Sequence, residues 1–420
     1  MYRFKLIIPI IVALILFSAA ASATETLTLS QCIQIALENQ YDMRIAKHNL
    51  NSYDLNFCRT FSVFYPQVTL SANYGYSGIE DSDPANAYSA TLSATQYIFD
   101  FGKSFREVGK AAASNKSYHA SFESTRQGAI YNVIYYYYSY LRQKHLEALN
   151  LENLNTAKSH LEKAKAFLRV GIKSRIDVTQ AEVTLANAEF SYLKAQNSLR
   201  LARLNLVNSF GYKSGYDFEV VDIADTSPFK ADIESCITEA ARSRPDVVQA
   251  KASLEAAKTD LNNAINFYSI TLSAKGNLTY SGVEMPLDKT WGWGAYAVLS
   301  VPIFDGFSTW QAILSAKENL KAVEVEREKL DFTIRSEIEI AYLSNSENYE
   351  AISVAGKSVE QAKENFDLAE ARYQNGVGSS IELNDATASL LNAQVNYVQS
   401  VYDYAISIAN LKKAMGTIHE

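Results

Sequence analysis

The sequence predicts a mainly helical protein with a smaller β-sheet part, and three observations support this class. The stretch AFLRVGIKSRIDVTQAEVTLANAE at 166–189 recurs as ARYQNGVGSSIELNDATASLLNAQ at 371–394, 205 residues later. Two long stretches, 103–170 and 308–375, contain no proline and few glycines, as long helices require. Four shorter stretches alternate apolar and polar residues with the period of a strand. One architecture therefore occurs twice in the chain.

The recurring stretch reads as the end of a long helix, a tight turn and the start of a returning helix. Gly171 and Gly376 end the two long helices at positions that need a positive φ. Gly378 gives the second turn further backbone freedom, and the serines that follow it can cap the next helix. The returning helices, 176–210 and 381–415, carry Leu, Ala and Tyr at alternating steps of three and four, which predicts coiled-coil packing.

The four alternating stretches predict two β-hairpins, each with one apolar and one polar face. The strands are expected at 67–76, 88–99, 270–280 and 291–303. Leu92 and Leu299 lie on the apolar faces, whereas Thr91 and Lys275 lie on the polar faces. Such alternation is typical of a transmembrane β-barrel, and a soluble sheet packed on the helices is the alternative. Four strands cannot close a barrel, since the smallest has about eight; two chains would give eight strands and three would give twelve.

The N-terminal residues 1–23 have the features of a secretory signal peptide. A basic start is followed by an apolar run, and Ala21-Ser22-Ala23 fits a cleavage site. A signal peptide favours the membrane interpretation of the hairpins. The formal net charge of -7 and the lack of a basic block argue against nucleic acid as a partner.

Candidate catalytic and metal-binding groups are sparse. Three cysteines and five histidines show no ligand spacing, so neither a metal, a cofactor nor a disulfide framework is predicted. Cys32 and Cys236 are expected to be small buried residues, with a disulfide as the minority alternative. The sequence shows neither a Ser-His-Asp arrangement nor a phosphate-binding loop, which argues against an enzyme.

The duplication also predicts the domain organisation. The first structural repeat, 24–211, contains a helix over 27–64, the hairpin 67–99, a long helix, the turn 171–175 and a return helix. The linker 212–232 is polar and could hold a short strand at Phe218–Val221. The second repeat, 233–420, contains the hairpin 270–303 and the turn 376–380 in the same order.

This order of signal peptide, strand pair, long helix, glycine turn and return helix, repeated once, resembles the TolC-like outer-membrane efflux protein family. The resemblance covers the mature chain. It implies a homotrimer with a twelve-stranded transmembrane β-barrel in outer-membrane lipid and an α-helical tunnel in the periplasm. It also implies a tripartite export system with a periplasmic adaptor (membrane fusion) protein and an inner-membrane pump of the resistance-nodulation or ABC type. The channel would conduct substrates passively and would not be an enzyme.

The resemblance further implies a gate at the helix turns. A tyrosine before the second turn and acids after it match Tyr373, Glu382 and Asp385, and Asp177 is the corresponding acid of the first copy. Three chains would bring these acids near one axis, where carboxylate rings favour cations. The alternative is that the acids only stabilise the first turns of their helices.

One position departs from the family pattern, which often has an arginine two residues after the second-turn glycine. Gly378 stands there, and Arg175 of the first turn is the candidate substitute.

A second function class is a periplasmic structural coiled-coil tether without a pore. It accounts for the heptad seams but leaves the two matched hairpins unexplained. Drug, metal and protein export, including type I secretion, are equally compatible with the sequence.

Overall fold

The structure is a computed structural model that describes residues 25–77, 85–212, 218–223, 226–265, 270–282 and 290–419. The predicted signal peptide lies outside the described residues. The chain forms two compact units. The turn unit contains Met1–Arg44, Thr125–Ser243 and Ile334–Glu420, and the strand unit contains Ile45–Ser124 and Arg244–Thr333.

The helices reproduce the duplication residue by residue. They are α2 (Leu29–Asn39), α3 (Tyr41–Thr60), α4 (Lys103–Arg169), α5 (Arg175–Ser209), α6 (Ile233–Ser243), α7 (Pro245–Ile265), α8 (Ser308–Gln374) and α9 (Ser380–Ala414), with a 3-10 helix at Phe61–Phe64. The bounds of α8 and α9 equal those of α4 and α5 plus 205. Among the described helices, none is both long and apolar enough to cross a membrane.

Equivalent aspartates begin the two long helices. Asp100 accepts a hydrogen bond from the backbone N–H of Ser104 at 2.8 Å, and Asp305 accepts one from the N–H of Thr309 at 2.9 Å. Each carboxylate thereby satisfies a backbone donor that the first helical turn leaves unpaired. The helix starts predicted from the repeat thus have a local cause.

The helix predicted over 27–64 is interrupted. Thr28 forms a capping box with Gln31, so α2 begins only at Leu29. Gln40 then adopts an extended conformation and separates α2 from α3. The capping box accounts for the start at Leu29, whereas the interruption lies at Gln40, whose extended backbone ends α2 while its N–H bonds the Ala36 carbonyl.

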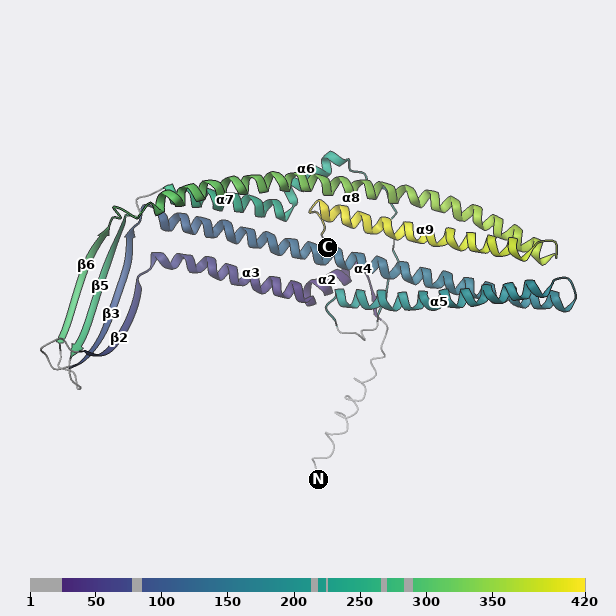
Figure 1. Cartoon of the computed structure of the whole chain (residues 1–420), viewed down its shortest axis with the longest axis horizontal. Helices are drawn as coiled ribbons and strands as arrows, with labels where there is room; N and C mark the ends of the chain where they lie inside the picture. The colour runs from purple at the N-terminus through teal and green to yellow at the C-terminus, as the bar shows by residue number, and fades with distance from the viewer. Residues whose placement is uncertain are drawn as a thin grey trace, which may run out of the picture. The chain divides into compact units, whose positions relative to one another are not determined.

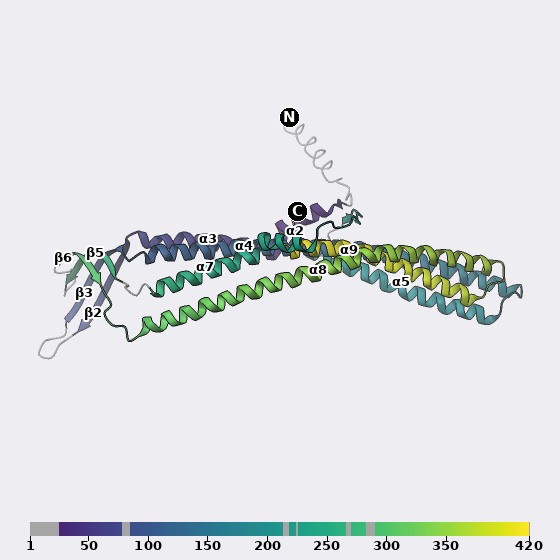
Figure 2. The same cartoon turned by 90° about the horizontal axis from the view of Figure 1, so that it is seen from above.

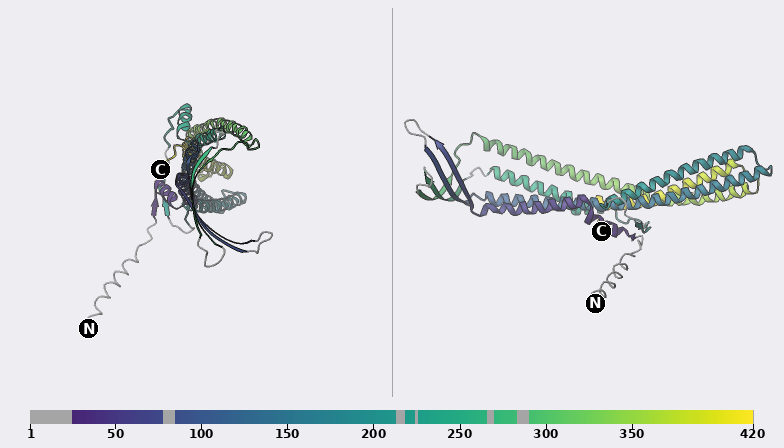
Figure 3. Two further views of the ribbon diagram at one scale, coloured as in Figure 1. Left: turned by 90° about the vertical axis from the view of Figure 1, so that its left-hand side faces the viewer. Right: turned by 90° about the horizontal axis from the view of Figure 1, so that it is seen from below.

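The four predicted strands form one antiparallel sheet. They are β2 (Gln67–Ser77), β3 (Ala85–Phe99), β5 (Thr271–Gly282) and β6 (Thr290–Ser300), in the order β2-β3-β5-β6. The two hairpins join through β3 and β5, and Figure 3 shows that the sheet is strongly curved. The predicted strand 291–303 ends at residue 300 because Pro302 has no backbone N–H to donate.

The register separates the two faces of the sheet as the alternation predicts. One row across the four strands consists of Leu70, Leu92, Leu278 and Trp293. These side chains are all exposed in the single chain, by 41 to 81%. Thr91 lies on the opposite face, where its hydroxyl is 3.2 Å from that of Thr279.

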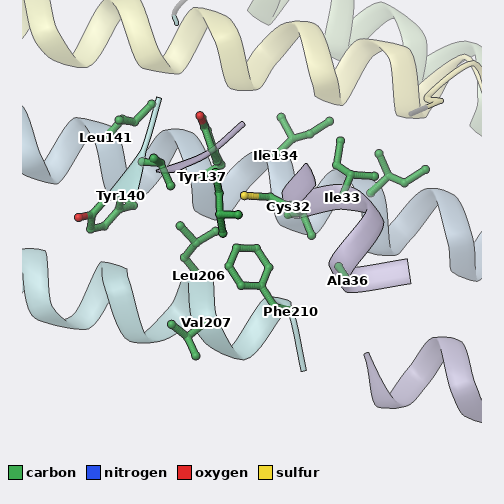
Figure 4. Packing of buried hydrophobic residues seen from close by; sticks show 14 of the residues in the cluster. Cys32, Ile33, Ala36, Ile134, Tyr137, Tyr140, Leu141, Leu206, Val207 and Phe210 are labelled. Atoms are coloured by element: carbon green, nitrogen blue, oxygen red, sulfur yellow. The ribbon is translucent and has the colours of Figure 1, made fainter. Parts of the chain in front are cut away.

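The core of the turn unit is built around α4. Figure 4 shows Cys32 of α2, Tyr137 of α4, Leu206 of α5 and Phe210, which follows α5, pointing toward one another. Two short strands, β1 (Glu25–Leu27) and β4 (Phe218–Val220), pair in parallel and contribute to this core.

The linker strand that the sequence suggested is therefore present as β4. Tyr137 donates a hydrogen bond to the carbonyl of Val221 just beyond it. The linker is thus fixed to α4 on the buried side of the unit.

The three cysteines are free thiols in the structure. Cys32 and Cys236 are buried and Cys58 is exposed. Burial raises the pKa of the Cys32 thiol to about 12, so this side chain behaves as a small apolar core residue.

Candidate functional site at the helix turns

Within the turn unit, each long helix forms a hairpin with the helix that follows it in the chain. In Figures 1 and 2, α5 runs back along α4 and α9 runs back along α8. Leu154 and Ala157 of α4 pack on Ala188 of α5, which is the predicted small-residue seam. Asn345 of α8 donates a hydrogen bond to Ser407 of α9 at 2.9 Å.

The two turns have the same backbone structure. Gly171 has a φ of 78° and Gly376 a φ of 77°, which confirms that both positions need a residue tolerant of positive φ. The next N–H, of Ile172 or Val377, bonds back to the carbonyl five residues earlier at 2.9 and 3.1 Å. This is the Schellman pattern, which satisfies carbonyls left unpaired at a helix C-terminus.

Gly378 is required for a different reason from the one the sequence suggested. Its φ is not positive, but an added Cβ would lie 2.9 Å from the backbone N of Tyr373 and 3.0 Å from the Cβ of Arg372. Close approach of the chain, rather than backbone freedom, therefore selects glycine. An arginine at this position does not fit without a shift of the turn.

Two hydrogen bonds connect the first turn to the second. The Lys173 ammonium donates to the carbonyl of Gly378 at 2.6 Å, and the Ser380 hydroxyl donates to the Asp177 carboxylate at 2.7 Å. We call these four residues the turn clamp. It joins the α4–α5 hairpin to the α8–α9 hairpin of the same chain.

The cation that bridges the turns is Lys173 and not Arg175. Arg175 is exposed, and no polar contact of its side chain is found in the described part of the chain. Lys173 and Gly378 are equivalent positions of the repeat, 205 residues apart. The difference between the two copies, a cation at one position and a glycine at its equivalent, was the signal that could have predicted the Lys173–Gly378 hydrogen bond.

Asp177 has both carboxylate oxygens occupied. Besides the bond from Ser380, it accepts bonds from the backbone N–H of Ser174 at 3.0 Å and from the Ser174 hydroxyl at 2.8 Å. The bonds from Ser380 and Ser174 hold the pKa of Asp177 below its ordinary value, against the opposing effect of burial. The residue therefore caps α5 and contacts the second hairpin at the same time.

The other two acids differ from Asp177. Glu382 forms an ion pair with Arg372 at 3.2 Å, and its backbone N–H is capped by Ser379 at 3.0 Å. Asp385 is exposed, and the described residues provide no polar partner for its carboxylate. Of the three candidate acids, only Asp385 thus presents an unoccupied carboxylate.

Tyr373 lies between the two hairpins and is only 2% exposed. Its ring makes an edge contact with Phe167 at 5.8 Å between centroids, and the Lys173 ammonium lies 5.3 Å from its centroid. Burial, with the charge of Asp177 as a smaller contribution, raises the pKa of the Tyr373 hydroxyl. The structure therefore brings Tyr373 and Asp177 together and leaves Asp385 apart from them.

Long helical hairpins combined with an antiparallel sheet that has one apolar face are the architecture of an outer-membrane channel. The sequence pattern of the outer membrane efflux protein family matches residues 32–212 and 236–417, one segment in each half of the chain. The chain belongs to this family of TolC-like outer-membrane efflux channels, and it is an outer-membrane protein.

Two relatives illustrate the similarity. The outer membrane protein TolC of Escherichia coli K12 is 23% identical over 436 aligned residues, covering 99% of this chain and 87% of the relative. The toluene efflux pump outer membrane protein TtgC of Pseudomonas putida is 26% identical, covering 92% and 82%.

Solved structures show the same fold. The CmeC outer membrane channel of Campylobacter jejuni is 20% identical with a TM-score of 0.81, covering 93% of this chain and 85% of the other. The MtrE outer membrane channel of Neisseria gonorrhoeae, in its open state, is 21% identical with a TM-score of 0.79, covering 92% and 88%.

Proposed function

We propose that this chain is the outer-membrane channel-tunnel of a tripartite export system and acts as a homotrimer. The observation that carries the proposal is the four-stranded sheet. Within the described residues, β2 pairs only with β3 and β6 pairs only with β5, so both outer strands have free edges. Exposed edges invite further strand pairing, and closure into a barrel removes them.

The direction of the strands permits closure with further copies of the chain. The four strands alternate in direction, so β6 of one copy can pair antiparallel with β2 of the next. Three copies supply twelve strands, which is within the even-numbered range of bacterial barrels. The exposed apolar row at Leu70, Leu92, Leu278 and Trp293 would then face lipid.

The supply of substrate requires partners, since the channel has no energy source of its own. We assign this role to a periplasmic adaptor protein and an inner-membrane pump of the resistance-nodulation or ABC type. Support comes from family membership and from relatives whose names describe efflux, such as the toluene efflux protein TtgC.

The turns would form the periplasmic gate. The turn clamp joins the two hairpins of each chain, and a ring of three Asp385 carboxylates would favour cations at the tip. Gate opening would then separate the α8–α9 hairpin from the α4–α5 hairpin and break the clamp. The contacts of Tyr373 and Asp177 across the hairpins support this assignment.

The proposal is tested by the mass and conductance of the purified protein in mild detergent and in planar bilayers. We expect a trimer that forms discrete channels. A monomer that keeps its β content would contradict the barrel. Extraction from membranes distinguishes the channel from the coiled-coil tether. A tether is released by salt or urea, whereas a barrel requires detergent.

A further inference from the structure

The four strands contain a single charged side chain. Lys275 in β5 is the only Asp, Glu, Lys or Arg in β2, β3, β5 and β6. A charge on the lipid-facing side of a membrane-spanning strand is unfavourable, most of all near the midplane. Whether Lys275 is tolerated in a membrane-spanning sheet therefore depends on which face of the sheet carries it.

The register places Lys275 on the polar face. It lies opposite Thr95 of β3 and Tyr296 of β6. Its neighbours along β5 on the same face are Ser273 and Asn277. This is the face that also carries the contact between Thr91 and Thr279.

No carboxylate neutralises this lysine in the described part of the chain. The Lys275 side chain is exposed and takes part in none of the ion pairs of the structure. The nearer end of β5, at Thr271, is four residues away, about 13 Å along an extended strand. That distance exceeds the Debye length of about 8 Å at physiological ionic strength, so the charge stands alone on its face.

We propose that Lys275 forms a cationic ring inside the barrel that selects for anionic solutes. The inference rests on the proposed trimer, in which three copies of Lys275 face one lumen at the same level. Rings of lysine or arginine favour anions in pores. The barrel and the tip would then carry rings of opposite sign, and an anionic substrate would meet the favourable ring after it has passed the turns.

The local potential can be measured with a cysteine reporter at Asn277, in a Cys58→Ser background because Cys58 is exposed. Cys32 and Cys236 are fully buried and do not interfere. Asn277→Cys trimers in liposomes are labelled with an anionic and with a cationic membrane-impermeant thiol reagent. The ratio of the two labelling rates is compared for Lys275, Lys275→Arg and Lys275→Gln.

The charge of residue 275 lies two residues from the reporter, at about 7 Å, and changes the labelling rate of each reagent about threefold in water at low salt. We expect the anionic-to-cationic rate ratio to be about sevenfold higher with lysine or arginine than with glutamine at low ionic strength. The difference should disappear near 1 M salt, where the Debye length is about 3 Å. The reversal potential of Lys275→Gln channels in a salt gradient should also shift toward cation preference.

Equal rate ratios for Lys275 and Lys275→Gln would overturn the ring. Absence of labelling at position 277 in a conducting trimer would also overturn it, because the polar face would then not line the lumen. Failure to form trimers or channels at all would instead overturn the proposed function, so the two failures are distinguishable.

Discussion

His160 is a buried titratable side chain in the seam between α4 and α8. It is 6% exposed, and its Nε2 has no hydrogen-bond partner among the described residues. On the same face of α4, Lys163 bonds Glu370 of α8 at 3.1 Å and Phe167 contacts Tyr373. Burial, and then the charge of Lys163, lower the pKa of His160 from its ordinary value, which favours the neutral ring.

A lowered histidine pKa makes the seam sensitive to acid. The unfolded or separated state binds the proton more tightly, so stability is complete above the ordinary pKa of 6.5 and falls as the pH drops toward the lowered value. We expect the unfolding temperature of the protein to decrease between about pH 7.5 and pH 5.5, and His160→Gln to reduce this decrease. Differential scanning calorimetry at both pH values measures the effect.

His119→Gln is the matched control, because His119 is half-exposed and bonds Asp54 in the strand unit at 3.1 Å. An unchanged pH dependence in His160→Gln would assign the acid sensitivity to other groups.

At the scale of elements, the two hairpins contact each other at the turns and also along their helices, where Lys163 pairs with Glu370 and Arg142 with Asp403. Within each hairpin, seams of Ala and Leu exclude water over many turns, as between α4 and α5. At the turns, the hairpins are joined by the two hydrogen bonds of the turn clamp together with the ring contacts of Tyr373. The turn clamp is thus a small polar contact at the ends of the hairpins, whereas the seams within a hairpin are apolar and extended.

Breaking the turn clamp should open the tip without separating the two helices of either hairpin. Because a hydrogen bond contributes about 0.5–1.5 kcal/mol and one to a charged group somewhat more, Lys173→Met with Ser380→Ala should weaken the contact by about 1–3 kcal/mol. We expect a higher single-channel conductance at an unchanged trimer mass.

Arg175→Met is the control, because it removes an exposed turn cation that makes no polar contact in the described residues. If the double variant conducts like the Arg175→Met control, the clamp does not restrain the gate.

At the scale of the whole molecule, function depends on which face of the sheet meets lipid. Leu92 and Thr91 are neighbours in β3 that point to opposite faces. Replacing Leu92 with lysine should cost about 2–4 kcal/mol if it faces lipid near the midplane, whereas the same change at Thr91 should cost far less. Chemical unfolding of the protein folded into vesicles measures both, and equal losses would mean that neither face is lipid-specific.

Local sequence features are sufficient to predict the long helices, the strands and the faces of the strands. Proline-free stretches and positive-φ glycines at 171 and 376 set the limits of the long helices, because these features act through the local backbone. A period of two assigned Leu92 and Thr91 to opposite faces for the same local reason. Tyr373 and Asp177 follow from the family resemblance, and each contacts the other hairpin in the structure.

The contacts between distant segments are visible only in the folded chain. The joining of β3 to β5, the choice of Lys173 over Arg175 and the close approach that selects Gly378 each depend on parts of the chain brought together by packing. Local sequence patterns report backbone preference and which face a residue occupies. They do not report which of two nearby side chains can reach a carbonyl that lies about two hundred residues away in the chain, since folding alone sets that distance.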